Sequence, residues 1–388
     1  MRRHSNRGRT LKGLGMKTPP RLLAALLCAL LIGPATGFPQ SAPTGAPAPR
    51  GLTPQTQKRL MESLNRAEVY LRQQQKPDGT WENHPGITAL AATALLRQPG
   101  VSRARQLEAV GKTLDGLVRL AKPDGGIYEN TIPHYITGVA AMALVAGGRP
   151  QDRPIIEKAR AYLAENLLDE GEGVGKNEFW YGGMGYGATT RADGRRADMI
   201  SLEYALRALK ESDLPESSPV WQKAIVFLQR AQNNSETNDQ AWAANDGGFV
   251  YYPGFTYHTD GGTRSYGSAT YAGILSYSWA SVKKDDQRVQ SVVKWIRDNY
   301  TVDENPGMGQ KTVYYYYMVF AKALQALGEP AIVDARGRSH DWREELGRKL
   351  LSLQHPEGYW VNEVKDEMQD NKVLVTSFTM AALQAILQ

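Results

Sequence analysis

The chain has 388 residues and a formal net charge of +6. Eight Lys and Arg residues and no acidic residue lie in residues 1–50, so residues 51–388 carry a net charge of −2. The positive charge therefore belongs to the N-terminus and gives no reason to expect nucleic-acid binding. The single cysteine, Cys28, also lies there. The remaining chain, which is long enough for a large core, can form no disulfide and no thiolate metal site.

The first 37 residues have the pattern of a secretory signal peptide. Residues 1–21 are basic, residues 22–32 form an apolar run, and small residues follow up to Gly37. The run is too short for a membrane-spanning helix, and the true start is either Met1 or Met16. Residues 38–54 are rich in Pro and Ala, which is typical of a linker. We therefore expect an exported protein, periplasmic or secreted, with no transmembrane segment after signal removal.

Residues 55–388 are predicted to form one domain that repeats a single unit six times. Each unit has a first helix, a Gly-rich turn and a second helix of small and apolar residues. The turns follow one another at intervals of about 46 to 62 residues, a period that indicates a repeat architecture. They contain, in chain order, Asp78-Gly79, Asp124-Gly125, "YGGMGYG" at 181–187, Asp246-Gly247, "NPGMGQ" at 305–310 and Glu357-Gly358.

The two helices of each unit differ in polarity. The second helices are apolar nearly all round, which is typical of buried helices; they start near Gly86, Tyr135, Ala197, Ser268, Val313 and Val373. The first helices carry more charge, as in residues 103–122 and 340–354, and are expected to lie outside. This alternation predicts an all-α fold, a closed (α/α)6 toroid of six outer and six inner helices. An open solenoid is the alternative, and six units without an obvious capping helix favour closure.

One unit carries a complete sequence motif of the first helix and its turn. A basic, a small, an aromatic and an aliphatic residue precede Gln and Gly-x-Trp, here as Arg66, Ala67, Tyr70, Leu71, Gln75, Gly79 and Trp81. Looser copies begin at Lys158 and Lys223, and the last copy keeps Gln354, Gly358 and Trp360. The motif resembles the QW repeat of squalene–hopene cyclases and their relatives, the prenyltransferase/squalene-cyclase superfamily. The resemblance covers roughly residues 55–388 and also includes secreted repeat proteins of unknown reaction.

The motif has a structural interpretation. The Gln amide is expected to bond backbone groups left unpaired at the end of the outer helix, and the Gly to adopt the left-handed conformation. The Trp is expected to stack over the amide and seal the joint to the next unit. The repeat therefore predicts architecture rather than chemistry.

The residues required for the chemistries known in the superfamily are missing from this sequence. Squalene–hopene cyclases protonate an alkene with Asp-x-Asp-Asp at an inner-helix start, a motif that this sequence does not contain. The nearest counterpart is Asp198, which is either a helix cap or a weak proton donor, since Arg195 and Arg196 are expected to lower its pKa. We predict no cyclisation of squalene or a comparable polyprene. The prenyltransferase zinc site and the Cys–Gln pair of thioester domains both need a cysteine, so we expect no metal and no cofactor.

The segments between each turn and its inner helix are predicted to open on one rim of the toroid. Helix N-termini on that rim would favour an anionic group of a ligand. Catalytic candidates there are Asp198, His258 and Tyr266, and binding candidates are His134, Asp260 and Arg264. His84 lies on the same rim. The alternative is that these are scattered loop residues without a common site.

Tyrosines are concentrated in the fifth inner helix, "VYYYYMVFAKAL" from Val313. Tyr314 and Tyr317 share a face because they are three residues apart. We predict that this face lines the central cavity, together with Tyr271 of the preceding inner helix. Such tyrosines could stabilise a cation, stack on a sugar ring or simply pack against the outer helices.

Three functional hypotheses follow from these residues. The first is a toroid that binds a hydrophobic or polyprenyl-like ligand in its centre without the known cyclase chemistry. The second is a polysaccharide lyase or glycosidase, since α/α toroids also host these activities. The third is a non-enzymatic interaction scaffold that binds partners on its rims. A dry aromatic cavity would favour the first, an open cationic groove the second, and a centre filled by side chains the third. The sequence leaves the oligomeric state open.

Overall fold

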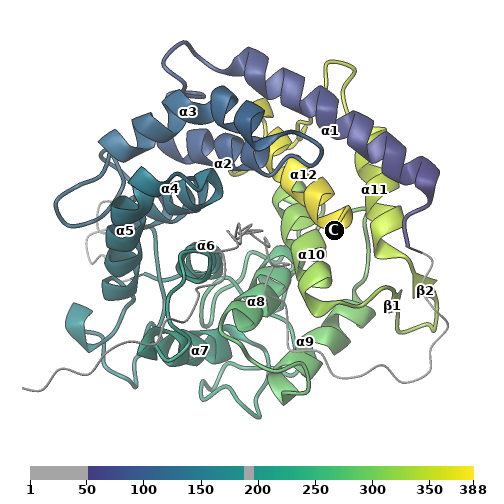
Figure 1. Ribbon diagram of the computed structural model, residues 1–388. Coiled ribbons are helices and arrows are strands. Elements are labelled where there is room, and N and C mark those ends of the chain that lie inside the picture. The colour runs from purple at the N-terminus through teal and green to yellow at the C-terminus, as the bar shows by residue number, and fades with distance from the viewer. Residues whose placement is uncertain (1–50, 188–195) are drawn as a thin grey trace, which may run out of the picture. The chain divides into compact units, whose positions relative to one another are not determined.

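The computed structural model describes residues 51–187 and 196–388, which belong to one compact unit. Within these residues, twelve α-helices alternate along the chain between an outer and an inner ring (Figure 1). The predicted all-α (α/α)6 toroid is therefore confirmed. The predicted signal peptide and the linker up to residue 50 lie outside the described residues. No helix within the described ranges is long and apolar enough to span a membrane.

The helices have the following bounds. The inner ring consists of α2 (Pro85–Leu96), α4 (Pro133–Gly147), α6 (Met199–Glu211), α8 (Gly267–Trp279), α10 (Val313–Leu327) and α12 (Lys372–Ile386). The outer ring consists of α1 (Pro54–Gln74), α3 (Arg103–Arg119), α5 (Arg153–Glu165), α7 (Pro219–Ala231), α9 (Gln287–Asp298) and α11 (Trp342–Leu353). Short 3-10 turns, η1 (Pro150–Asp152) and η2 (Glu170–Glu172), and one antiparallel pair, β1 (Ile332–Val333) with β2 (Ser339–His340), lie between helices.

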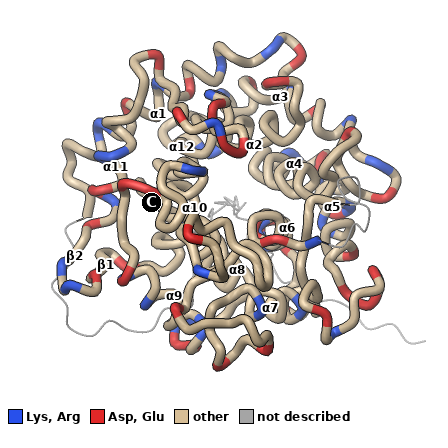
Figure 2. Tube along the Cα trace, turned by 180° about the vertical axis from the view of Figure 1, so that it is seen from behind, with Lys and Arg blue, Asp and Glu red and all other residues tan. Residues whose placement is uncertain are grey.

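Side-chain polarity explains which helices lie inside. Helices α2, α4 and α8 contain no Lys, Arg, Asp or Glu, and nearly all of their residues are buried. The outer helices bury one stripe and expose the other, and most charged segments in Figure 2 lie on outer helices and loops. Each fully buried aliphatic side chain contributes roughly 1.5–3 kcal/mol to folding. The inner ring is therefore the core of the fold.

The ring is closed, as the sequence favours. Each inner helix packs on the next, and α12 packs on both α10 and α2. The Gln384 side-chain amide of α12 donates to the backbone oxygen of Ala94 in α2 at 2.7 Å. The first outer helix, α1, packs on α11 and α12. The last unit therefore meets the first, which excludes the open solenoid.

The Gln of the motif joins neighbouring units. The Gln75 amide nitrogen donates to Ala109 O at 3.2 Å and to Thr113 Oγ1 at 3.0 Å, and both acceptors lie in the next outer helix, α3. The Gln354 amide nitrogen donates in the same way to Ser63 O of α1 at 3.0 Å. The expectation that Gln serves the end of its own helix was therefore wrong. The Gln side chain instead bonds the following outer helix and so links neighbouring units of the ring.

The Trp of the motif instead serves the end of its own outer helix. The Trp81 indole N–H donates to Leu71 O at 2.8 Å, and the Trp360 N–H donates to Leu350 O at 2.8 Å. Both acceptors lie in the last turn of their helices, where carbonyl groups have no partner within the helix. Both Trp side chains are fully buried. The indole therefore supplies the hydrogen bond that we had expected from Gln.

The turn glycines are required by conformation and by close approach. Gly79 has φ 89° and Gly358 has φ 97°, a region that side chains disfavour. A Cβ atom on Gly79 would lie 2.9 Å from the backbone nitrogen of Thr113. A Cβ atom on Gly358 would lie 2.5 Å from Arg66 O in α1. Each turn therefore rests directly on the backbone of the next outer helix.

Candidate functional site

At one end of the ring, which we call the rim, the starts of four inner helices (α4, α6, α8 and α10) are hydrogen-bonded to neighbouring loop segments. Each bond runs from an inner-helix start to the segment before the next inner helix: His134 N–H to Tyr186 O, Met199 N–H to Tyr251 O, Gly267 N–H to Pro306 O, and Tyr314 N–H to Gln369 Oε1. Segments from the second to the sixth unit therefore form one continuous surface.

Asp198 caps the start of α6 on this rim. Its carboxylate accepts hydrogen bonds from the backbone N–H groups of Ile200 (3.0 Å) and Ser201 (2.8 Å) and from the Ser201 hydroxyl (2.8 Å). The side chain is 4% exposed. Burial raises the pKa of Asp198 to about 6, although its hydrogen bonds to Ser201 and Ile200 oppose the change. We expected Arg195 and Arg196 to lower this pKa. Arg195 lies outside the described residues, and among the described ones burial dominates and the pKa is raised.

The Asp198 carboxylate acts electrostatically on four tyrosines, and together with Asp198 and Glu367 we call them the mouth: Tyr186, Tyr251, Tyr257 and Tyr266. Burial raises the pKa of all four hydroxyls, and the Asp198 carboxylate raises each of them further. The rings of Tyr251 and Tyr257 lie 4.6 Å apart. Tyr266 is buried at the N-cap of α8. The structure therefore brings Asp198 and Tyr266 together.

Glu367 brings a second carboxyl group to the mouth, from the segment before α12. Its charge also raises the pKa of Tyr186, Tyr257 and Tyr266. Glu367 is exposed, and partial desolvation, followed by the charge of the neighbouring Asp366, raises the pKa of its carboxyl group. The backbone at Glu367 is left-handed, with φ 47°, a strained conformation that is concentrated at functional sites in proteins. Our sequence reasoning missed Glu367, whose one signal is an acidic segment directly before an inner helix.

The mouth has the opposite polarity to that expected for the rim. Among the described residues its charged groups are the carboxyls of Asp198 and Glu367, which disfavour an anionic ligand. Arg264, which was expected to attract an anion, pairs with Asp260 at 2.9 Å. Both side chains are more than half exposed, 65% for Arg264 and 60% for Asp260. This ion pair lies in solvent, and the anion preference assigned to it has no support in the mouth.

The histidines of the rim have local roles. His134 Nδ1 lies 3.1 Å from Gly185 O, and its ring meets Tyr162 of outer helix α5 edge-on. His258 Nδ1 accepts from the backbone N–H of Asp260 at 3.1 Å. His84 Nδ1 accepts from the first N–H groups of α2 and caps that helix. The three histidine rings therefore bond nearby backbone groups of loops and a helix start, and these contacts do not involve Asp198.

The tyrosines of α10 divide between the interior and the outer layer. The Tyr317 hydroxyl donates to Val302 O at 3.1 Å, and Tyr314 packs edge-on against Tyr317. Tyr271 packs on Tyr316 and Phe320. The expectation that Tyr271, Tyr314 and Tyr317 line the central wall therefore does not match these contacts.

Tyr315 is the tyrosine of α10 that points to the interior. Its ring lies 6.3 Å from Tyr204 of α6 and 5.8 Å from Phe378 of α12, and Tyr204 lies 5.1 Å from Tyr135 of α4. The hydroxyls of Tyr204 and Tyr315 are enclosed and form no hydrogen bond of normal geometry within residues 51–187 and 196–388, although Tyr135 and Tyr204 interact electrostatically. Side chains therefore fill the ring at this level, the arrangement that we expected for an interaction scaffold. A catalytic site would have to lie on the rim rather than in the ring centre.

A charged network lies deeper in the ring. Glu211 of α6 pairs with Arg97 at the end of α2 (2.6 Å) and with Arg207 (2.9 Å). Burial opposes its ionisation, but the two guanidinium groups lower the pKa of Glu211 to about 2. Among the described residues, neither carboxylate oxygen of the fully buried Glu203 forms a hydrogen bond of normal geometry, although the Trp279 side chain lies near enough to favour the charged form. Burial raises the pKa of Glu203 although Arg207 and Lys322 oppose it. The interior is thus both aromatic and charged.

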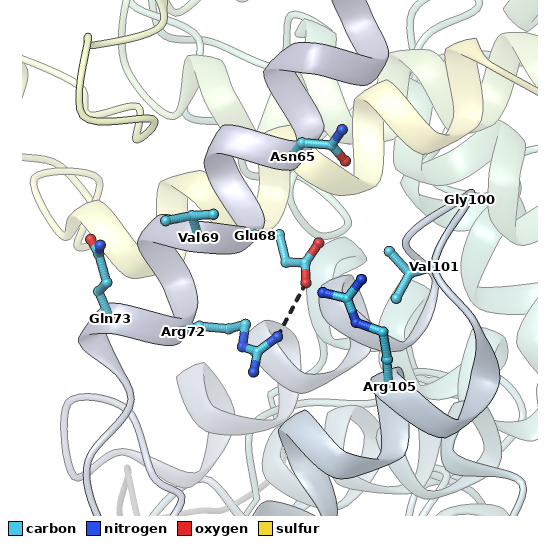
Figure 3. A pocket seen from close by; sticks show the side chains of 8 residues that line it. All are labelled: Asn65, Glu68, Val69, Arg72, Gln73, Gly100, Val101 and Arg105. Carbon is cyan, nitrogen blue, oxygen red and sulfur yellow. Dashed lines mark ion pairs between the residues drawn. The ribbon is translucent and has the colours of Figure 1, made fainter.

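A separate groove of about 550 Å³ lies on the outer layer, between α1 and α3 (Figure 3). Its lining consists of Asn65, Glu68, Val69, Arg72, Gln73, Gly100, Val101 and Arg105. Arg72 and Glu68, four residues apart on α1, form a 3.5 Å ion pair along one wall of the groove. No residue of the mouth belongs to this groove. In the described parts of the chain, no three His, Cys, Asp or Glu side chains gather as metal ligands.

No protein-family model matches the sequence, and no curated protein matches it. Solved structures do match its fold. The type II terpene cyclase MstE from Scytonema, in complex with the product merosterolic acid A, is 17% identical with a TM-score of 0.56, over 87% of this chain and 99% of that one. A polysaccharide lyase is 11% identical with a TM-score of 0.55, over 85% and 97%.

A glycosidase is also similar, with 14% identity and a TM-score of 0.50, over 87% of this chain and 99% of that one. At these identities the likeness concerns the fold alone. The similar proteins include terpene-acting and polysaccharide-acting enzymes, so the comparisons do not choose between the first two functional hypotheses. The chain is an α/α toroid of the type found in type II terpene cyclases, glycosidases and polysaccharide lyases.

Proposed function

We propose that the mouth binds a neutral glycan and hydrolyses a glycosidic bond, with Asp198 as proton donor and Glu367 as general base. One observation carries this proposal: the buried carboxyl group of Asp198 and the exposed carboxyl group of Glu367 lie close enough to the same three tyrosines, Tyr186, Tyr257 and Tyr266, to act on their hydroxyls. Glycosidases use a pair of Asp or Glu residues that flank the bond. Tyrosine rings and hydroxyls suit a sugar, which presents C–H faces and polar edges.

The two carboxyl groups would divide the reaction between them. Because its pKa is about 6, Asp198 keeps part of its proton near neutral pH. The tyrosines above this buried carboxyl group would have to move apart to admit the glycosidic oxygen, to which Asp198 then donates its proton as the carbon–oxygen bond breaks. Glu367, in its ionised form, would take a proton from the water that attacks the anomeric carbon. The water oxygen bonds the anomeric carbon, the departing hydroxyl keeps the proton from Asp198, and Glu367 holds the proton from the water. Transfer of one proton from Glu367 to Asp198 through solvent restores both groups. The rate should fall as the pH rises through about 6, because Asp198 then loses its proton.

The same groups fit poorly to the other reactions known on this fold. Alkene protonation needs an unusually strong acid, whereas burial makes Asp198 a weaker acid than an ordinary aspartic acid. This supports the prediction that squalene is not cyclised. A lyase that acts on a uronate needs a cation beside the carboxylate of its substrate, and Arg264 is paired in solvent instead. Export of the protein, which the leader sequence predicts, stays part of the proposal.

The experiment measures release of reducing ends from cello-, xylo- and manno-oligosaccharides by the purified full chain. We expect hydrolysis of at least one series, its loss in Asp198→Asn and in Glu367→Gln, and retained glycan binding in both variants. Asp260→Asn, which changes an exposed rim carboxylate, is the matched control and should behave like the wild type. Activity that survives in Asp198→Asn, or binding of none of the three series, would refute the proposal.

A polyprenyl ligand in the ring centre is the second candidate. The row of rings from Tyr135 through Tyr204 and Tyr315 to Phe378 favours it, because aromatic faces stabilise carbocations. One of the similar MstE structures contains a ligand with a polyprenyl chain, its substrate geranylgeranyl dihydroxybenzoate. These rings would have to move apart to admit a chain. Saturable binding of geranylgeraniol that Tyr315→Leu removes would favour this candidate over the glycan.

A further inference from the structure

A row of aromatic side chains leads from the mouth across the protein surface. We call Phe179, Trp180, Tyr252, Phe255 and Tyr257 the aromatic strip. Three of them are largely exposed for their type, Phe179 at 40%, Phe255 at 37% and Tyr257 at 46%. Exposed aromatic groups that form one contiguous patch indicate a binding surface, whereas scattered ones need no explanation.

The rings of the strip follow one another without a gap. Their centroids are separated by 4.3 Å from Phe179 to Trp180, 5.3 Å from Trp180 to Tyr252, 4.7 Å from Tyr252 to Phe255 and 5.2 Å from Phe255 to Tyr257. At the other end, Tyr257 lies 4.6 Å from Tyr251, the mouth residue whose pKa Asp198 raises. The strip is therefore continuous with the mouth.

The backbone holds the strip in place. In "YYPGFTY", residues 251–257, the N–H of Phe255 donates to Tyr252 O at 2.9 Å, and Gly254 has φ 80°. Pro followed by a left-handed Gly is typical of a tight type II turn. The turn stacks Tyr252 and Phe255 with an interplanar angle of 13°.

The other half of the strip is anchored by an ion pair. Arg230 donates to the backbone oxygen of Glu178, directly before Phe179, at 2.8 Å, and its guanidinium pairs with Asp239 at 2.7 Å. Both halves of the strip are therefore set before a ligand binds, which reduces the entropy lost on binding.

We infer that the aromatic strip is a row of sugar-binding positions that continues the mouth, so that the substrate is a chain of several sugar units rather than a short glycan. This inference rests on the proposed function of the mouth. Flat faces in sequence suit the repeated C–H faces of a linear glycan, and the Tyr252 and Tyr257 hydroxyls can bond its edges. Continuity with the carboxyl groups of the mouth favours a glycan over a protein partner.

The test compares binding of a disaccharide and a hexasaccharide to the full-length Asp198→Asn variant by calorimetry, in the cello, xylo and manno series. We expect the hexasaccharide of the preferred series to bind about tenfold or more tightly than the disaccharide. Phe255→Ala and Trp180→Ala, each added to that variant, should remove most of this difference and leave disaccharide binding unchanged. Trp180→Tyr keeps a ring and should retain part of the difference. Leu353→Ala, which removes an exposed apolar side chain of α11, is the control.

Each remaining outcome has a definite meaning. Equal affinity for the short and long glycans, or strip variants that keep the full difference, would overturn the inference and leave the proposed function in place. Failure of every glycan to bind at either length would overturn both. A dimer of the full chain that Phe255→Ala converts to a monomer, without any effect on glycan binding, would assign the strip to self-association and overturn the inference.

Discussion

At the scale of single residues, Asp198 serves the fold and the mouth with one carboxyl group. It caps α6 through two backbone N–H groups, a role that contributes roughly 0.5–2 kcal/mol. Its burial beneath the tyrosines of the mouth raises its pKa to about 6. A cap on an exposed helix would titrate as an ordinary acid, so the surroundings rather than the cap set its proton affinity.

This pKa makes stability depend on pH in a definite direction. The folded protein binds the Asp198 proton more tightly than the unfolded chain, whose Asp has a pKa of 3.8. The stabilisation from this proton is complete below about pH 4 and is lost as the pH rises through about 6. Asp198→Asn still caps the helix but does not titrate. We therefore expect wild type to lose up to about 3 kcal/mol relative to Asp198→Asn between pH 4 and 7.

Urea unfolding of both proteins at several pH values in this range measures the difference directly. A difference in unfolding free energy that stays constant with pH would show that the Asp198 carboxyl titrates alike in the folded and unfolded states. The raised pKa assigned to it would then be wrong.

Residue positions were harder to predict from the sequence than residue types. Asp198 could be recognised as a cap, because a short acidic side chain stood before an apolar helix. The sequence could not show which of the four consecutive tyrosines faces the interior. All four are buried, and the helix has no polar side that would orient it. Glu367 was missed because its loop, from a distant part of the chain, reaches the mouth only when the ring closes.

At the scale of elements, the joint between successive units depends on a few side chains and a glycine. Gln75 reaches α3, Trp81 holds the end of α1, and Gly79 lets the turn lie on the α3 backbone. The spacing of these residues was visible in the sequence and predicted the joint correctly. The roles of Gln and Trp were exchanged, because sequence spacing does not tell whether an amide extends toward its own helix or the next.

The glycine has a matched control within the chain. Gly79 and Gly261 both have positive φ, but a Cβ atom on Gly261 would meet open space. We expect Gly79→Ala to destabilise the fold by roughly 1–4 kcal/mol, and Gly261→Ala by less, about 1 kcal/mol. Thermal unfolding of the two variants gives the comparison. Equal effects would mean that backbone conformation alone, without the contact to α3, explains the glycine.

The indole of Trp81 combines packing with a hydrogen bond. Trp81→Ala should cost roughly 3–5 kcal/mol, because it empties a fully buried site. Trp81→Phe keeps most of the ring but loses the N–H that bonds Leu71 O, and it should cost less, about 1–3 kcal/mol. Denaturant titration checks both values. If the midpoints of both variants match wild type, the structural role of the motif is refuted.

At the scale of the whole molecule, closure makes the last joint equivalent to the internal ones. Gln354 bonds α1 as Gln75 bonds α3. The sequence indicated closure only through the count of six units, since no local pattern shows that the two ends of the domain meet. The sequence also could not show that side chains fill the centre, because the aromatic contacts across α4, α6, α10 and α12 depend on the diameter of the closed ring.

Removal of either amide should therefore have a similar effect. We expect Gln354→Ala and Gln75→Ala each to lower the free energy of unfolding by about 1–3 kcal/mol, in one cooperative transition. In an open array the contact between the terminal units would contribute little, so a neutral Gln354→Ala beside a destabilised Gln75→Ala would contradict closure.

The central claim is that the mouth and the aromatic strip form one glycan-binding surface around Asp198. Its most direct test is a crystal structure of the Asp198→Asn variant with cello-, xylo- or manno-hexasaccharide. We expect sugar rings over Trp180 and Phe255, a glycosidic oxygen in hydrogen-bond reach of residue 198, and a water beside Glu367. A glycan seated elsewhere, as in the groove between α1 and α3, or a mouth without glycan at saturating concentration would contradict it.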